Sequence, residues 1–136
     1  MYILCVRINI CYFFFLQTMS FDWVNNLVVS GITSINSQLS HLVINNCNDV
    51  VVKNVKLIAP DKSPNTDGIH VQYSNRVTIN GCIMQTGDDC ISIGDATYNL
   101  LMSNIKCGPG HGVRLVSPWF MSIWVQNKQT LNSITN

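Results

Sequence analysis

Residues 86–90 read Thr-Gly-Asp-Asp-Cys and place two carboxylates, Asp88 and Asp89, side by side. Because neighbouring negative charges repel, at least one carboxyl in such a cluster is expected to have a raised pKa while the others stay ionised. A protonated carboxyl beside an ionised one can donate a proton and activate water in the same reaction. The alternative is an acidic turn, since Asp and Gly are both turn formers. Neighbours in space must decide between the two.

Four similar segments show which residues those neighbours are. Each alternates apolar positions and then reaches a Gly or Asn at residue 31, 54, 81 or 104, with spacings of 23, 27 and 23; the segments are residues 25–32, 48–55, 75–82 and 98–105. A second alternating run follows in each repeat, from His41, Asp67, Asp89 and His111. Alternation with period two, broken by Gly and Asn, predicts strands. The repeat length therefore predicts an all-β fold, a parallel β-helix of about four coils.

The composition agrees with strands and turns. Asn occurs 16 times and all seven acidic residues are Asp, residue types that favour turns and left-handed corners over helix interiors. The leucine-rich repeat has a similar length, but its Leu-rich consensus and helical segment are absent from the sequence.

Alignment of the second runs brings the polar residues together. When Ile69, Ile91 and Val113 are matched, Asp67, Asp89 and His111 fall in one column, 22 residues apart each time, with Asp88 one position earlier. Adjacent strands lie about 4.8 Å apart, so these groups are expected to share one surface patch. His41 would extend the column by one coil if the loops keep the register. Three carboxylates beside an imidazole favour acid/base chemistry of the kind that glycoside hydrolysis requires.

Other functional classes have less support. The net charge of +1, without a run of Lys or Arg, argues against nucleic acid. The six Cys residues form no C-x-x-C pair, so no zinc site is predicted, and some disulfide bonding in an oxidising compartment fits better. Cys82 occupies an inward position and is expected to be a buried free thiol. The glycines of residues 107–113 are interpreted as a turn exposing His111, because no helix pattern follows them to bind phosphate.

The apolar residues 1–16 are interrupted by Arg7 and Asn9 and are too short to cross a bilayer, so no membrane span is expected. Three interpretations stay open for this segment: a secretory signal, a buried strand, or sequence foreign to the fold.

Three ordered motifs carry a family resemblance: SPNTDGIHV at 63–71, TGDDCISIG at 86–94 and CGPGHG at 107–112. Together they closely resemble the plant polygalacturonases, pectin-degrading glycoside hydrolases with a right-handed, single-stranded parallel β-helix. The resemblance runs from about Phe21 to Val113. It implies a secreted, extracellular or cell-wall protein, monomeric, acting on an acidic polysaccharide such as polygalacturonate, without a metal or other cofactor.

The resemblance also implies roles for single residues. Asp88 would be the general acid, Asp67 and Asp89 would position and deprotonate water, and hydrolysis would invert the anomeric carbon. His111 would assist, through its effect on Asp88. Three further residues have implied roles: Asn65 would lie beside substrate, and a disulfide would join Cys90 and Cys107. Carboxyl groups about 5 Å apart are generally associated with retention, so inversion here follows the family.

The chain also departs from the family pattern. It contains no Arg-x-Lys motif, which in the family grips substrate carboxylates, and the sequence after Val113 differs from the family's. We therefore expect a fragment in three parts: an unmatched apolar segment (1–18), a partial β-helix with the catalytic coils (19–116) and a divergent tail (117–136). Alone, it is expected to hydrolyse polygalacturonate weakly or not at all. The alternatives are a non-catalytic pectin-binding β-helix and a hydrolase of another pectic polymer, such as a rhamnogalacturonan.

Overall fold

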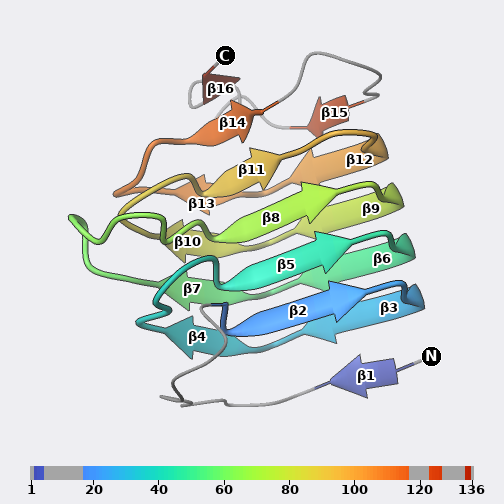
Figure 1. The fold of residues 1–136 in the computed structure, drawn as a ribbon, viewed down its shortest axis with the longest axis horizontal. Helices are drawn as coiled ribbons and strands as arrows, with labels where there is room; N and C mark the ends of the chain where they lie inside the picture. Colours follow the sequence, from blue (N-terminus) through green and yellow to red (C-terminus); the bar gives the residue numbers. More distant parts are fainter. Residues whose placement is uncertain (1, 5–16, 117–122, 127–133, 136) are drawn as a thin grey trace.

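The computed structural model describes residues 2–4, 17–116, 123–126 and 134–135, and in this part of the chain the regular structure is strand throughout. The strands form three parallel sheets that wrap a common core (Figure 1). The first sheet contains β1 (Tyr2–Leu4), β3 (Asn25–Ser30), β6 (Asn48–Lys53), β9 (Asn75–Asn80), β12 (Tyr98–Ser103) and β15 (Ile123–Gln126). The second contains β2 (Met19–Asp22), β5 (Leu42–Asn45), β8 (Ile69–Gln72), β11 (Ile91–Ile93), β14 (Val113–Leu115) and β16 (Ile134–Thr135). The third contains β4 (Thr33–Ile35), β7 (Lys56–Ile58), β10 (Ile83–Gln85) and β13 (Lys106–Cys107).

The predicted parallel β-helix of about four coils is confirmed. In the first sheet β3, β6, β9 and β12 pair in parallel, with Leu27, Val50, Val77 and Leu100 in register. In the second sheet Ile69, Ile91 and Val113 are partners, as the sequence alignment expected. The third sheet was not specified by the sequence, because its strands have two or three residues and show no usable alternation.

Inward side chains stack from coil to coil to form the core. The two columns of the first sheet are almost fully buried: Leu27, Val50, Val77 and Leu100, then Val29, Val52, Ile79 and Met102. The second sheet contributes a third column, which includes Leu42, Ile69, Ile91 and Val113. Burial of each of these side chains contributes roughly 1.5 to 3 kcal/mol. Because each coil covers the next, the core is continuous along the stack.

The corners explain the many Asn residues. Gly31, Asn54, Gly81 and Asn104 all have φ between 53° and 69°, the left-handed conformation that Gly and Asn accept most easily. Side-chain amides also bond between coils: Asn104 Nδ2 donates to Asn80 Oδ1 at 3.0 Å. Asn is therefore used here for backbone geometry and for stacking, independently of any chemistry.

Part of the sequence-based division of the chain lies outside the described residues. Residues 1 and 5–16 of the segment 1–18, and residues 117–122, 127–133 and 136 of the tail, are not described. The three-part division therefore stays a prediction. Within the described residues, no helix has the length and apolar character that crossing a membrane requires.

A close backbone approach holds the segment between β7 and β8 against the turn that carries Asp88. A Cβ at Gly87 would lie 2.6 Å from the Pro60 carbonyl oxygen and 2.6 Å from Ser63 N, and would also contact the Ser63 carbonyl oxygen. Backbone atoms cannot move aside as a flexible side chain can. The site turn and the β7–β8 segment therefore fit together only with Gly at 87.

We predict that Gly87→Ala lowers the free energy of unfolding by about 2 kcal/mol, since the added methyl collides with backbone. Urea unfolding followed by circular dichroism measures this. Gly31→Asn is the matched control, because a Cβ at 31 has open space and Asn occupies the same corner in other coils. Equal losses in the two variants would contradict the prediction.

Candidate active site

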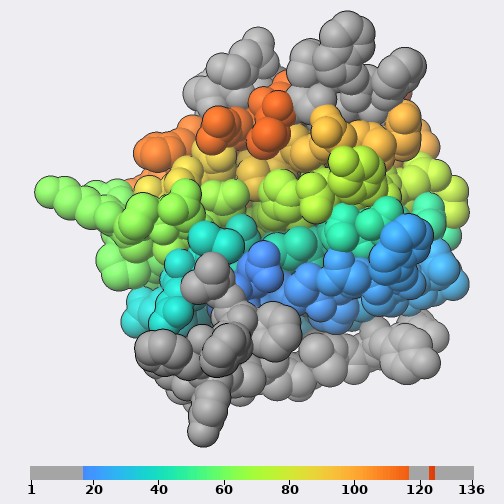
Figure 2. Space-filling view, in the orientation of Figure 1, coloured from blue at the N-terminus to red at the C-terminus, as the bar shows by residue number. Residues whose placement is uncertain are grey.

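The predicted polar residues lie at one end of the second sheet, in the turns that lead into β8, β11 and β14. Figure 1 shows these three strands starting at the same side of the molecule, and Figure 2 shows the green β7–β8 segment projecting beside them. A cavity of about 390 Å³ opens here. It is lined by Gln17, Leu39, Ser40, Val43, Asn65, Asp67, His70, Gln72, Asp88, Asp89, Ser92, Arg114 and Val116.

Asp88 lies at the cavity surface and is held by three hydrogen-bond partners. Its Oδ2 accepts from Asn65 N at 3.0 Å, and its Oδ1 accepts from Asp89 N at 2.9 Å. His111 Nδ1 lies 3.2 Å from Oδ1. The side chain is still 21% exposed, so it can meet a ligand from the cavity side.

Asp89 is the buried member of the pair, with a side chain only 4% exposed. Burial raises the pKa of Asp89, and repulsion from Asp67 and Asp88 raises it further, while Arg114 and His111 oppose the shift. Arg114 Nη1 lies 3.6 Å from Asp89 Oδ2. The sequence expectation of one carboxyl with a raised pKa is thus met at Asp89, whereas the family resemblance assigns the acid role to Asp88.

Asp67 is oriented by a hydroxyl from the next coil. Ser92 Oγ donates to Asp67 Oδ2 at 2.7 Å, and the same Oγ lies 2.7 Å from His70 Nδ1. Ser92 is buried and all three residues line the cavity. Asp67 therefore faces the cavity in an orientation set by neighbouring side chains.

The structure places Asn65, Asp67, Asp88 and Asp89 around one cavity and His111 beside Asp88, while the roles of these residues stay predictions. His111 is largely exposed and contacts Asp88 rather than its column partner Asp89. Asn65, with φ of 56°, lines the cavity and bonds Asp88 through its backbone. Other polar residues that line the cavity were missed, among them His70, Ser92 and Arg114. The spacing of 22 between these three was the available signal, since they form the outward row on β8, β11 and β14.

The extension of the column to His41 is wrong. Leu42 pairs with Ile69, so His41 aligns with Gly68 and not with Asp67. The extra residues of the β7–β8 segment cause this shift of one position. His41 points into the core, is fully buried, and its Nδ1 lies 2.7 Å from Ser34 Oγ.

The burial of His41 predicts a loss of stability in acid. Burial lowers the pKa of His41 from 6.5 to about 4. Between these values the unfolded chain binds a proton that the folded chain does not, so the stabilisation is complete above pH 6.5 and falls as the pH approaches 4. The loss amounts to about 3 kcal/mol.

Denaturant unfolding across this pH range, compared between the unaltered chain and His41→Gln, measures the effect. The variant is expected to show a shallower loss of stability on acidification. Because the raised pKa of Asp89 acts in the opposite direction and is common to both proteins, the difference isolates His41. Parallel curves for the two proteins would contradict the prediction.

The implied disulfide between Cys90 and Cys107 is present. It joins the residue after Asp89 to β13, so it braces the coil that leads to His111. Cys82 is a buried free thiol, as predicted, and Cys47 is another. Cys5 and Cys11 lie outside the described residues.

Within the described part of the chain, one group has the composition of a metal site. Asp88, Asp89 and His111 each offer a ligand atom, and these atoms lie within 4.8 Å of one another. Acidic groups are often clustered in this way without a cation. The expectation that the chain uses no metal or other cofactor stays a prediction.

Comparison with known proteins identifies the family. A model of the glycosyl hydrolases family 28 matches residues 16–127, which include every site residue described above. The chain belongs to glycosyl hydrolase family 28.

Individual family 28 relatives are similar over the same region. A polygalacturonase of Prunus persica is 50% identical over 100 residues, which cover 74% of this chain and 25% of the relative. An exopolygalacturonase of Zea mays is 48% identical over 96 residues, covering 71% and 23%. The structure of a polygalacturonase from Erwinia carotovora ssp. carotovora matches with a TM-score of 0.76 at 25% identity, covering 80% of this chain and 31% of that one. The family 28 chain thus spans about a quarter of the length of these plant relatives.

Proposed function

We propose that this site hydrolyses α-1,4 galacturonosyl linkages of polygalacturonate, the backbone of pectin, by acid/base catalysis with inversion at the anomeric carbon. The observation that carries the proposal is the convergence of Asp67, Asp88 and Asp89 in one cavity, with Asp89 buried and its pKa raised. Family membership supports the reaction class. The proposed localisation of the protein is the extracellular space or the cell wall.

Asp88 is the proposed general acid. It is the more exposed of the adjacent pair, so its carboxyl can reach a glycosidic oxygen in the cavity. Asp88 gives its proton to that oxygen as the bond to the anomeric carbon breaks. The backbone donors of Asn65 and Asp89 fix the direction of its carboxyl, which keeps the proton aimed at the bound linkage.

Asp67 and Asp89 are proposed to hold and deprotonate the attacking water. A carboxylate with a raised pKa is a stronger base, so the raised pKa of Asp89 suits this role. The water oxygen bonds to the anomeric carbon and its proton passes to a carboxylate. His111 completes the site by its contact with Asp88 Oδ1.

The substrate is an acidic polymer facing acidic side chains, so a cation is needed nearby. Among the described residues that line the cavity, Arg114 is the one Lys or Arg. Its guanidinium is 58% exposed and can contact a galacturonate carboxylate while it stays close to Asp89. Since the sequence holds no Arg-x-Lys motif, we expect slow turnover by the 136-residue chain. We also propose that the protein acts as a monomer.

Proton NMR of the first products decides the proposal. With enough protein for cleavage to outpace the mutarotation of the products, incubation with polygalacturonate is expected to release β-anomeric galacturonate ends first, because one displacement inverts an α linkage. Release of α-anomeric ends would contradict inversion. Saturable binding without product would indicate a pectin-binding β-helix, and faster release from rhamnogalacturonan would indicate the other pectic substrate.

A further inference from the structure

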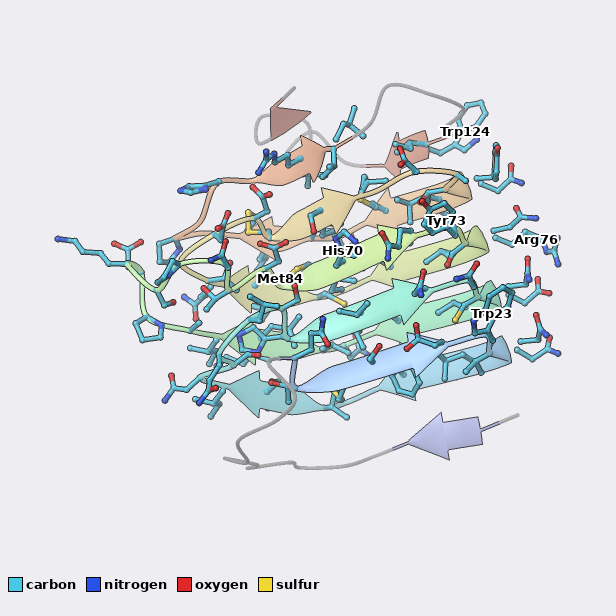
Figure 3. All side chains as sticks on the ribbon, in the orientation of Figure 1. Trp23, His70, Tyr73, Arg76, Met84 and Trp124 are labelled. Carbon is cyan, nitrogen blue, oxygen red and sulfur yellow. A yellow bond between two sulfur atoms is a disulfide. The ribbon has the colours of Figure 1, made fainter. Side chains whose placement is uncertain are left out.

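A second row of polar residues lies beside the carboxylates on the outer face of the second sheet. His70 on β8 pairs in register with Ser92 on β11, and Ser92 with Arg114 on β14. His70 is labelled in Figure 3, where it lies at the middle coils of the stack. His70 and Ser92 are not part of the acid/base mechanism described above, yet both line the cavity.

The hydrogen bonds in this row have a defined direction. A serine hydroxyl has one proton, and the Ser92 proton is donated to Asp67 Oδ2 at 2.7 Å. Ser92 Oγ can therefore only accept in its 2.7 Å contact with His70 Nδ1. This requires a proton on Nδ1, so the chain of donors runs from His70 through Ser92 to Asp67.

We propose that His70 and Ser92 are positioning residues for Asp67. The bond from Ser92 Oγ fixes Oδ2 of Asp67, and the contact with His70 Nδ1 fixes the Ser92 hydroxyl. Among the described residues, none bonds Asp67 Oδ1, which can therefore bind water in the cavity. His70 does not need to touch substrate for this role, because it acts through the Ser92 hydroxyl. The proposal rests on the proposed function in that it assigns Asp67 to water binding.

The burial of Ser92 supports a fixed arrangement. The residue is 2% exposed, so solvent cannot readily replace either partner of its hydroxyl. A buried hydroxyl left without partners is costly, about 1 to 3 kcal/mol. His70 and Asp67 each satisfy one of its two capacities, so losing either one disturbs the other.

The ring tautomer of His70 tests the proposal without any need for turnover. Nitrogen-15 NMR of the full chain at mildly alkaline pH, where histidine is neutral, distinguishes a protonated Nδ1 from a protonated Nε2. The arrangement requires a pyrrole-type signal at Nδ1 of His70. Imidazole free in water prefers the proton on Nε2, so the expected result is a departure from the default form.

Ser92→Ala removes the acceptor and is expected to return His70 to the Nε2 form, and also to shift the carbon-13 signal of the Asp67 carboxyl. Ser92→Thr keeps a hydroxyl and is expected to restore both signals. Ser103→Ala, an outward serine on β12, is the matched control and should change neither. If Ser92→Ala disturbs the fold, the reduced dispersion of its amide spectrum will show it. In that case the His70 tautomer in the unaltered chain and in Ser92→Thr tests the proposal.

A proton on Nε2 of His70 in the unaltered chain would overturn the proposal. So would a His70 tautomer that stays the same in a folded Ser92→Ala. Because these signals are read without substrate, a failure here differs from a failure of the proposed function, which would appear as the wrong anomer or as no product.

Discussion

Asp88→Asn is expected to lower the hydrolysis of polygalacturonate by about a thousandfold, since general acid catalysis typically contributes a hundredfold to ten-thousandfold. Asn has nearly the same shape as Asp, but it has one side-chain oxygen where Asp88 has two, so it can keep only one of the bonds from Asn65 N and Asp89 N. What it lacks is the proton for the leaving oxygen. End-labelled oligogalacturonides, which allow very slow cleavage to be followed, provide the measurement.

A substrate with a better leaving group separates the acid from the base. The fluoride ion of a galacturonosyl fluoride leaves without needing a proton. Asp88→Asn is therefore expected to lower the rate of hydrolysis much less with this substrate than with the polymer. Asp89→Asn should impair both reactions by about a hundredfold, because water must be deprotonated in each. Asp95→Asn, in an exposed position after β11, is the matched control and should keep full activity.

The opposite pattern would exchange the two roles. If Asp89→Asn were rescued by the fluoride and Asp88→Asn were not, the buried carboxyl with the raised pKa would be the acid. The electrostatics of the free site alone allow that assignment, since it is the pKa of Asp89 that is raised. The greater exposure of Asp88 is the reason for preferring it as the acid.

Loss of the disulfide is the second large expected effect. Cys90 and Cys107 close a loop with a sequence separation of 17, and a crosslink of this size stabilises by about 3 kcal/mol. Cys107→Ser should lower the free energy of unfolding by this amount, measured by urea unfolding. It should also weaken the contact between His111 and Asp88, because the bond braces the segment before His111.

Reduction of the unaltered chain is a matched control for the substitution. Reductant should destabilise the chain by a similar amount and should leave the stability of Cys107→Ser unchanged. Cys82→Ala removes a free thiol and leaves the disulfide in place, so its response to reductant should match that of the unaltered chain. A Cys107→Ser protein as stable as the unaltered chain would contradict a bracing role.

Much of the fold could be predicted because each coil repeats the same physical solution. Inward apolar residues and Gly or Asn corners recur at fixed intervals, so the registers of Leu27 with Val50 and of Ile91 with Val113 could be derived by counting. The third sheet could not, because strands as short as β13 are set by the corners around them rather than by their own pattern.

At the site, counting residues from one repeat to the next does not always predict the correct neighbours. Asp67, Asp89 and His111 are separated by coils of equal length and were placed correctly, whereas His41 lies across the longer β7–β8 segment and was misplaced by one position. Counting also aligned His111 with Asp89, but its ring contacts Asp88. The difference in burial between Asp88 and Asp89 depends on how their turn packs, and this packing cannot be predicted from the identities of the neighbouring residues.

The most direct test of the central claim, that stacked coils couple three carboxylates into one site, is a carbon-13 NMR titration of the Asp89 carboxyl. We predict a pKa above the ordinary 3.8, lowered by Asp67→Asn and by Asp88→Asn because each removes a nearby negative charge. Arg114→Gln should raise it further. An Asp89 pKa at or below 3.8 that neither Asp substitution changes would contradict the coupled site.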